Sequence, residues 1–230
     1  MPTIKENLNK INRQIIEAAV SCGRNSETIQ LIAVSKRKSI EAVRQAIKAG
    51  AGHFGENYIQ EAVGKIDAIG KENACWHFIG HLQSNKAKVA VKYFEYIHTI
   101  DTLKLAKGID KQAKKIDKIQ KILLQVNISE EETKSGTNSK EAVELAKQIS
   151  RLENLSLQGL MCMPPFFSDP EPARIYFKQL TQIQDEITAH HFDNVSMEHL
   201  SMGMSNDFRV AIEEGSTMVR IGTSIFGRRD

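Results

Sequence analysis

The sequence predicts an α/β protein that folds as a single (β/α)8 barrel of the TIM type. Eight short segments with the pattern of strands, the first of them an apolar run rich in β-branched residues, alternate with amphipathic segments of helical periodicity. The connections between these segments are short, and no linker or low-complexity tract divides the chain. Alternating strand–helix units form parallel sheets, and eight such units are the number that closes into a barrel. We therefore expect one domain over residues 1–230.

An open, doubly wound sheet is the alternative for the same alternation of elements. Such sheets usually carry a glycine-rich phosphate-binding loop directly after their first strand. Here the first strand is followed by Ser35-Lys36-Arg37-Lys38, which contains no glycine. The barrel is therefore the predicted fold, with an extra helix before the first strand.

The chain opens with an amphipathic segment at 3–22, in which apolar residues recur every three or four positions until Gly23 ends the helix. The first strand follows at 30–35 as a continuous apolar run. A strand without alternation is covered on both faces, as the strands of parallel sheets are. Its helix is expected to begin at Ser39 and to end before Gly50.

The later units repeat this pattern. Ser84 is a suitable N-cap for the helix after the third strand, and Asp101 or Thr102 for the helix after the fourth. The expected strands cover residues 30–35, 53–57, 76–80, 96–100, 121–127, 155–163, 195–199 and 217–221. The helices that follow them are expected at 39–49, 57–69, 85–92, 103–116, 140–151, 171–190 and 206–214, with a helical turn at 223–226.

The composition is that of a globular protein of a reducing compartment. Hydrophobic residues at 41% and charged residues at 26% exclude wholesale disorder, and the net charge of +3 is too small to argue for nucleic acid. The three cysteines form no CxxC pair and predict neither a disulfide framework nor a zinc ribbon. The chain contains no apolar run of about 18 residues and no signal-peptide core. We expect a cytoplasmic protein without membrane or nucleic-acid partners.

Lys36 is the strongest candidate for chemistry. It stands where the first strand ends, and the reacting residues of barrels come from the carboxyl ends of the strands, which open on one rim. Desolvation in such a mouth lowers the pKa of a lysine and makes its amine nucleophilic toward an aldehyde. A solvated lysine that simply closes a strand is the alternative. The residues expected at the other strand ends are Asn57, His81, Asp101, Asn127, Met163, Ser201 and Arg220.

Two loops near the C-terminus have the chemistry of a phosphate site. Barrels often bind a phosphate with the loops after strands seven and eight. The first loop offers hydroxyls at Ser201 and Ser205, and the second places Gly222 and Thr223 after the last strand. A helical turn at 223–226 would direct backbone N–H groups at an anion. Because strands one, seven and eight are close in a barrel, this arrangement suits a phosphorylated aldehyde, although two helix-capping turns are the alternative.

Other features are interpreted as structural. His77 and His81 are four residues apart but flank a strand end, so they do not indicate a zinc pair. The lysine-rich stretch at 104–121 has apolar residues at helical spacing, which favours a solvated helix face over a site for nucleic acid or an acidic partner. Phe166-Phe167, after Pro164-Pro165, is expected to pack on the core, and an exposed apolar corner that a partner could use is the alternative. Cys162 is expected to be an inert core residue.

Six motifs follow one another along nearly the whole chain. They are Ala33-Val34-Ser35-Lys36, Phe54-Gly55-Glu56-Asn57, and the segments 77–86, 159–161, 200–207 and 215–227. In sequence and order they resemble the pyridoxal phosphate homeostasis proteins, single-domain relatives of the alanine racemase N-terminal barrel. Long motifs in one order are a specific signal, so the chain is identified as a member of this family.

The resemblance implies a barrel that holds pyridoxal 5′-phosphate (PLP), a form of vitamin B6, as a Schiff base on Lys36. It implies a role in PLP homeostasis, which is the storage and buffering of the aldehyde, with PLP-dependent apoenzymes as candidate recipients. It implies no metal and no established catalytic turnover. The cofactor-binding residues that it implies are Lys36, Asn57, Ser201, Met202, Ser205, Arg220, Gly222 and Thr223.

The roles implied by position fit a carrier. Ser201, Gly222 and Thr223 would contact the phosphate, Asn57 would lie beside the ring, and Arg220 would face the pyridine nitrogen. An arginine there disfavours protonation of the ring, because two positive charges in a shielded site repel each other. An unprotonated ring is a poorer electron sink for catalysis.

A low-activity amino-acid racemase is the alternative function. The alanine racemases that the family resembles take a second base, a tyrosine, from a C-terminal β domain, and here only Tyr58 lies near the rim. The sequence ends at Asp230 without such a domain, so a monomer is expected. Lys38 and Lys134 are expected as secondary lysines that could compete with Lys36 for PLP.

Overall fold

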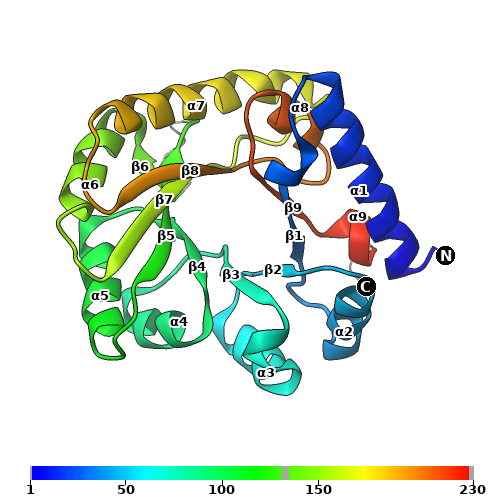
Figure 1. The fold of residues 1–230 in the computed structure, drawn as a ribbon, viewed down its shortest axis with the longest axis horizontal. Helices are drawn as coiled ribbons and strands as arrows, with labels where there is room; N and C mark the ends of the chain where they lie inside the picture. The colour runs from blue at the N-terminus through cyan, green and yellow to red at the C-terminus, as the bar shows by residue number, and fades with distance from the viewer. Residues whose placement is uncertain (1, 130, 132–134, 228–230) are drawn as a thin grey trace.

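The computed structural model describes residues 2–129, 131 and 135–227, and its architecture is the predicted closed barrel (Figure 1). Within these residues, eight parallel strands pair in the order β1-β2-β3-β4-β5-β7-β8-β9, and β9 pairs with β1 again. The strands are β1 (Gln30–Val34), β2 (His53–Glu56), β3 (Cys75–Phe78), β4 (Tyr96–Ile100), β5 (Gln120–Asn127), β7 (Leu155–Met161), β8 (Val195–Ser201) and β9 (Met218–Ile221).

A short additional strand, β6 (Thr137–Asn138), pairs with the end of β5 outside the barrel and was not predicted. Two residues are too few to carry a periodicity, so the sequence gives no sign of them. The segment before β6 lies close to the backbone of β5 at Gly136. This residue adopts φ 132°, and a Cβ there would lie 2.5 Å from the backbone nitrogen of Asn127, so glycine is required.

A ring of helices surrounds the strands (Figure 1). Each helix buries one face against the sheet, as its apolar spacing predicts. The helices after the strands are α2 (Ile40–Lys48), α3 (Ile59–Ile69), α4 (Ala87–Tyr93), α5 (Leu103–Lys114), α6 (Ala142–Ile149), α7 (Arg174–Ala189), α8 (Phe208–Glu213) and α9 (Thr223–Phe226). None of the described helices combines the length and the apolarity that crossing a bilayer requires.

The predicted caps are largely confirmed. Ser39 accepts a hydrogen bond from the backbone of Ala42 at 3.2 Å, and Thr102 accepts one from Leu105 at 3.3 Å. The prediction that Ser84 caps the helix after the third strand is wrong. Ser84 begins a 3-10 turn at Ser84–Lys86, and α4 starts only after that turn.

The N-terminal helix α1 (Ile4–Ser21) completes the ring. Among the described residues, the helix that follows the last strand is α9, which is a single turn and too short to cover a strand. The longer α1 lies against α2, α8 and α9 and covers this side of the barrel (Figure 1). Asn7 Nδ2 donates to the Ile225 carbonyl at 2.9 Å, and Arg24 donates to the Ile212 carbonyl at 2.6 Å. The predicted extra helix is therefore part of the barrel's own packing.

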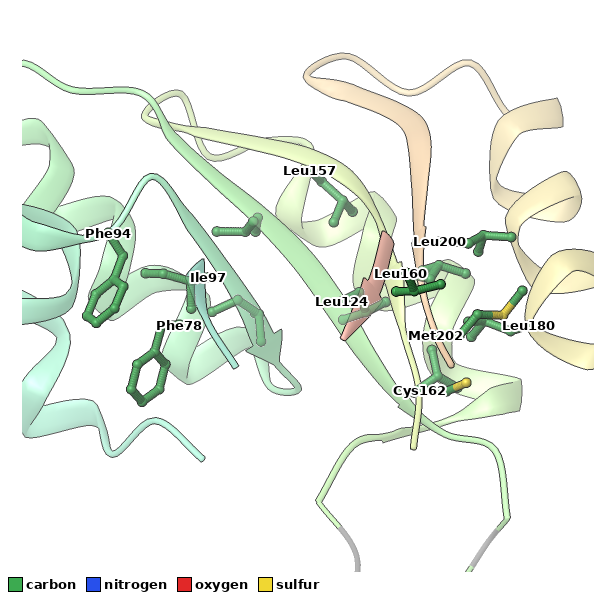
Figure 2. Close-up of a cluster of buried hydrophobic side chains, with 14 of the residues drawn as sticks. Phe78, Phe94, Ile97, Leu124, Leu157, Leu160, Cys162, Leu180, Leu200 and Met202 are labelled. Atoms are coloured by element: carbon green, nitrogen blue, oxygen red, sulfur yellow. The ribbon is translucent and has the colours of Figure 1, made fainter. Parts of the chain in front are cut away.

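The core has two layers. The larger layer lies between the strands and the helices, and Figure 2 shows part of it, with Leu160, Leu200 and Met202 in one cluster with Leu180 of α7. The smaller layer fills the barrel interior, and its members are Ile32, Tyr96, Leu123, Met161 and Met218. Several interior positions are polar instead, among them His77, Ser201 and Arg220.

Several strand ends differ from prediction: β1, β2 and β7 end one or two residues early, at Val34, Glu56 and Met161, and two further ends bear on the site. The third strand ends at Phe78 rather than Gly80, because a Cβ at Gly80 would lie 2.2 Å from the Asn57 carbonyl and the two backbones approach closely there. The strand β8 runs to Ser201, which pairs with Met161 and Met218, so Ser201 belongs to the sheet and not to the loop after it.

Candidate functional site

The carboxyl ends of the strands enclose a pocket of about 280 Å³. It is formed by the segments after β1, β2, β3, β7 and β8 together with the end of β9. This volume is at the small end of the range of about 300–1,000 Å³ that is usual for ligand pockets, so the ligand is a compact one. Six of the eight predicted site residues line the pocket: Lys36, Asn57, Ser205, Arg220, Gly222 and Thr223.

Lys36 lies in the turn directly after β1 and is half-buried. The strand β1 pairs with β9 in a register that places Ala33 opposite Ile221. A Cβ on Gly222 would lie 3.3 Å from the Val34 carbonyl oxygen, which is tight packing, so the two strand ends approach closely. The pairing of β1 with β9 therefore brings Lys36 to the same wall of the pocket as Gly222.

A buried ionic network holds the turn that carries Lys36. Lys65 Nζ, from α3, donates to the Ser35 carbonyl at 2.6 Å and to Glu56 Oε1 at 2.7 Å. Ser35 Oγ donates to the same carboxylate oxygen at 2.6 Å. Burial raises the pKa of the Glu56 carboxyl, although the ammonium of Lys65 acts against this rise. This network was not predicted, because Ser35, Glu56 and Lys65 meet only in three dimensions.

Arg220 is buried at the base of the pocket with its guanidinium held on two sides. One nitrogen donates to Ser201 Oγ at 2.7 Å, and the other donates to the Cys162 carbonyl at 2.9 Å. Burial lowers the pKa of Arg220, which still remains a cation because an arginine pKa is so high. The pocket therefore has a fixed positive charge on its floor.

Ser201 and Met202 do not line the pocket. Ser201 is fully buried inside the barrel, where its hydroxyl lies 2.9 Å from His98 Nδ1 and accepts from Arg220. Met202 points the other way and is buried in the outer core layer (Figure 2). Successive side chains of a strand face opposite sides, which explains the difference between these neighbours. In this structure Ser201 contacts Arg220, which does line the pocket, and Met202 packs in the core.

Asn57 and Asp207 are the remaining polar side chains of interest. Asn57 Oδ1 is buried and has no hydrogen-bond partner among the described residues, so a ligand group that donates would satisfy it. Asp207 Oδ1 accepts from the Met204 backbone at 2.6 Å and shapes the loop after β8. Burial raises the pKa of the Asp207 carboxyl. Asp207 was missed as a site residue, although it stands at the end of a motif that the sequence analysis quoted.

The segment after β7 forms an apolar wall of the pocket through Met163, Phe166 and Phe167. The prediction that Phe166 packs on the core is wrong, because 79% of its surface is exposed. Phe167 stacks on Tyr176 with ring centroids 6.1 Å apart, and its carbonyl accepts from Asn206 at 2.8 Å. The strand β7 has already ended at Met161, and the Pro164-Pro165 pair, which cannot continue a ladder of hydrogen bonds, lies between its end and these phenylalanines.

Other predicted candidates lie elsewhere or play structural parts. His81, Asp101 and Asn127 are absent from the pocket lining. The lysines of α5 are exposed, as expected for a solvated face. Burial raises the pKa of the Cys162 thiol to about 12, which agrees with an inert core cysteine.

The secondary lysines and the candidate second base can also be placed. Lys38 lines the pocket and donates to the carbonyls of Phe226 and Gly227 at 3.2 and 3.4 Å. Lys134 lies outside the described residues. Tyr58 is half-exposed under the guanidinium of Arg37, and no tyrosine lines the pocket in the part of the chain that the structure describes.

Comparison with known proteins identifies the class that this fold and rim define. The family described as "Alanine racemase, N-terminal domain" matches residues 4–230. The chain is 44% identical over its full length to the pyridoxal phosphate homeostasis protein of Vibrio alginolyticus, of which it covers 99%, and 42% identical to that of Escherichia coli, of which it covers 98%. The chain belongs to the alanine racemase N-terminal domain family and, within it, to the pyridoxal phosphate homeostasis proteins.

Solved structures agree with the fold. The chain aligns to PipY of Synechococcus elongatus, solved with PLP bound, with a TM-score of 0.82 and 34% identity, over 93% of this chain and 100% of that one. It aligns to a protein of Bifidobacterium adolescentis with a TM-score of 0.91 and 32% identity, over 97% and 94% of the two chains. Alanine racemase from Corynebacterium glutamicum shares the fold, with a TM-score of 0.71 at 14% identity over 96% of this chain and 61% of that one.

Proposed function

We propose that this protein binds PLP and takes part in intracellular PLP homeostasis, with the cofactor held as a Schiff base on Lys36. One observation carries the proposal: a single pocket brings together an amine at Lys36, a guanidinium at Arg220 and the hydroxyl-bearing loop at Gly222 and Thr223. These are the groups that an aldehyde, an aromatic ring nitrogen and a phosphate require. The relatives support the proposal. Those from Vibrio alginolyticus and Escherichia coli align over nearly their full length and are named pyridoxal phosphate homeostasis proteins, and PipY was solved with PLP bound.

The residues present fit the cofactor. The unpartnered Asn57 Oδ1 is an acceptor on the pocket wall. Ser205 and Thr223 offer hydroxyls from two neighbouring loops, which suits a phosphate. The apolar side chains of Met163 and Phe166 provide a surface for a ring, and the pocket has the size of a compact ligand.

The chain's own groups favour holding PLP over using it. When bound, PLP supplies an aldehyde that condenses with an amine and a ring that withdraws electrons. Arg220 is fixed by Ser201 and the Cys162 carbonyl, so it cannot move away from the ring nitrogen that it would face. Its charge opposes protonation of that nitrogen, which weakens the ring as an electron sink. We therefore propose a carrier without appreciable turnover.

An amino-acid racemase of low activity is the second candidate function. The family match to alanine racemase N-terminal domains favours it. A racemase needs a base on each face of its substrate, and the described pocket offers no tyrosine for the second one. Solvent-deuterium exchange at the α-carbon of amino acids, dependent on Lys36, would support this function. Exchange no faster than with free PLP would leave the carrier.

The absorption spectrum of the purified protein with PLP tests the main proposal. We expect a visible band from the imine, and we expect Lys36→Ala to abolish it. Lys38→Ala is the matched control, since Lys38 lies in the same pocket and its replacement should leave the band. Borohydride reduction followed by peptide mapping should mark Lys36. Marking of Lys38 or Lys134 instead would overturn the assignment of the Schiff base.

Three further properties belong to this proposal. We propose that residues 1–230 form a single binding domain and that the protein delivers PLP to apoenzymes, as a carrier could. We also propose a cytoplasmic location, because the free thiols suit a reducing compartment. The predicted monomer is tested by light scattering during size-exclusion chromatography. Transfer is tested by the recovery of activity when a PLP-dependent apoenzyme is mixed with the loaded protein.

A further inference from the structure

A second cluster of chemically active side chains lies at the opposite end of the barrel from the pocket. His53 is the first residue of β2, and Cys75 and His77 are the first and third residues of β3. The register of β2 and β3 places His53 opposite Cys75 and Gly55 opposite His77. Paired residues of parallel strands share a face, as do residues two apart, so all three side chains project into the barrel interior.

The three side chains are close enough to share one ion. Their ligand atoms all lie within 4.8 Å of one another, and His53 Nδ1 lies 3.0 Å from His77 Nε2. Zinc bonds of about 2.0–2.3 Å place tetrahedral ligand atoms about 3.3–3.8 Å apart. Bringing even the widest separation, 4.8 Å, into this range shortens it by about 1.0–1.5 Å, so small side-chain movements would place the three ligand atoms at three corners of a tetrahedron.

His77 is oriented from behind, as metal-binding histidines usually are. Its second ring nitrogen, Nδ1, lies 2.9 Å from His98 Nε2, and His98 Nδ1 lies 2.9 Å from Ser201 Oγ. The ring also stacks on Tyr96, with centroids 4.8 Å apart and planes 6° apart. These contacts fix the direction of His77 Nε2, which leaves that nitrogen facing His53.

The site is accessible from solvent. His53 and Cys75 are half-buried at the amino-terminal mouth, so an ion and a water ligand can enter. The charges of Glu95 and Lys121 both act on the Cys75 thiol, and these two side chains form an ion pair at 2.9 Å, so they offset each other there.

We propose that His53, Cys75 and His77 form a binding site for a divalent transition-metal ion of the zinc type. Two imidazoles and one thiolate are the donor set that zinc prefers, and it disfavours magnesium and calcium, which take oxygen ligands. On binding, the Cys75 thiol gives its proton to solvent as the sulfur–metal bond forms, and the imidazole that donates in the His53–His77 hydrogen bond carries its proton on its other ring nitrogen instead. A water molecule fills the fourth position at the mouth.

Calorimetric titration with zinc chloride tests the site. We expect one zinc ion per wild-type chain and at least a tenfold weaker dissociation constant for Cys75→Ala and for His53→Gln. His77 is left intact, because its buried contacts with His98 support the fold. The matched control is Cys22→Ala, which removes an exposed cysteine of the chain and should change nothing. Lys36→Ala should also bind one zinc, since Lys36 lies at the other end of the barrel.

Titration with cobalt(II) reports the ligands directly. We expect the charge-transfer band of a thiolate–cobalt bond in wild type and in Cys22→Ala, and its loss in Cys75→Ala. Circular dichroism establishes whether each variant is folded. If Cys75→Ala is not folded, Cys75→Ser is used in its place. Wild-type protein that binds no stoichiometric zinc, or variants of Cys75 and His53 with unchanged affinity, would overturn the proposal.

Discussion

Lys65 is distant from Lys36 in the sequence, but it holds the turn that carries Lys36. Its ammonium joins Glu56 and the carbonyl of Ser35 in a region from which water is excluded. We expect Lys65→Met to lower the free energy of unfolding by about 3–5 kcal/mol, because it leaves the Glu56 carboxylate buried without its cation. Urea unfolding measures this loss, and Lys107→Met, on the exposed face of α5, should stay within about 0.5 kcal/mol of wild type.

The double variant Lys65→Met with Glu56→Gln separates the ionic effect from lost packing. Neutralising Glu56 removes the fully buried unpaired charge, whereas Glu61, the second carboxylate on Lys65 at 2.6 Å, keeps contact with solvent, so we expect the double variant to be more stable than Lys65→Met alone. Equal stability of the two variants would show that the aliphatic stem of Lys65, and not its charge, supports the turn.

The carboxyl of Asp207 should make stability depend on pH. Burial raises its pKa above the ordinary 3.8, so the folded protein holds this proton at pH values where the unfolded chain has lost it. The stability of wild type relative to Asp207→Asn should therefore be greatest below pH 3.8 and should fall as the pH rises through the folded pKa. Urea unfolding at a series of pH values measures this difference, and Asp185→Asn, on the exposed side of α7, is the control. A difference that grows with pH would contradict the sign.

At the scale of single elements, periodicity predicted the strands and helices because each one has a buried face. It placed the ends less well, and the boundary of β8 decided the outcome for two site residues. A loop beginning at residue 200 would let Ser201 and Met202 both approach a ligand. The continued strand instead sends Ser201 inward and Met202 outward, since one step along a strand reverses the side chain.

The helix α1 is the element whose role has the clearest energetic test. Leu8 is buried in the layer that α1 forms with α8 and α9, and only 1% of its surface is exposed. We expect Leu8→Ala to lower the free energy of unfolding by about 2–5 kcal/mol, since the surrounding core cannot fully collapse into the space. Ile16→Ala on the same helix is the control, because 48% of Ile16 is exposed. Equal effects of the two substitutions on urea unfolding would show that α1 does not act as part of the barrel wall.

At the scale of the whole molecule, strand-end positions predicted much of the rim because all parallel strands of a barrel point the same way. Lys36, Asn57 and Arg220 could be found by this rule alone. Side chains that meet across different elements could not be found in this way, because their contacts depend on how the elements pack and on strand register. The pairing of Lys65 with Glu56 is one case. The cluster of His53, Cys75 and His77 is another, since the sequence spacing directs attention to His77 with His81, which lies outside the barrel interior.

The closure of the barrel explains why a ligand at the rim should stabilise the entire chain. The pairing of β1 with β9 joins the two ends of the fold, and the pocket lies across this junction, with Lys36 on one side and Thr223 on the other. A ligand attached to both sides binds only the closed barrel, so its free energy of binding adds to the free energy of unfolding. At a PLP concentration 100 times the dissociation constant, this addition is about 2.7 kcal/mol.

We therefore expect the Tm of wild type to rise with PLP concentration and that of Lys36→Ala to rise far less. Hydrogen exchange should locate the gain, with slower exchange of amides in β1 and β9 than in β4 and β5 on the opposite side. Lys107→Ala, on the exposed face of α5, should keep the wild-type response, because Lys107 lies away from the junction. A Tm that rises equally in wild type and Lys36→Ala would mean that PLP stabilises the protein without bridging the two ends of the barrel.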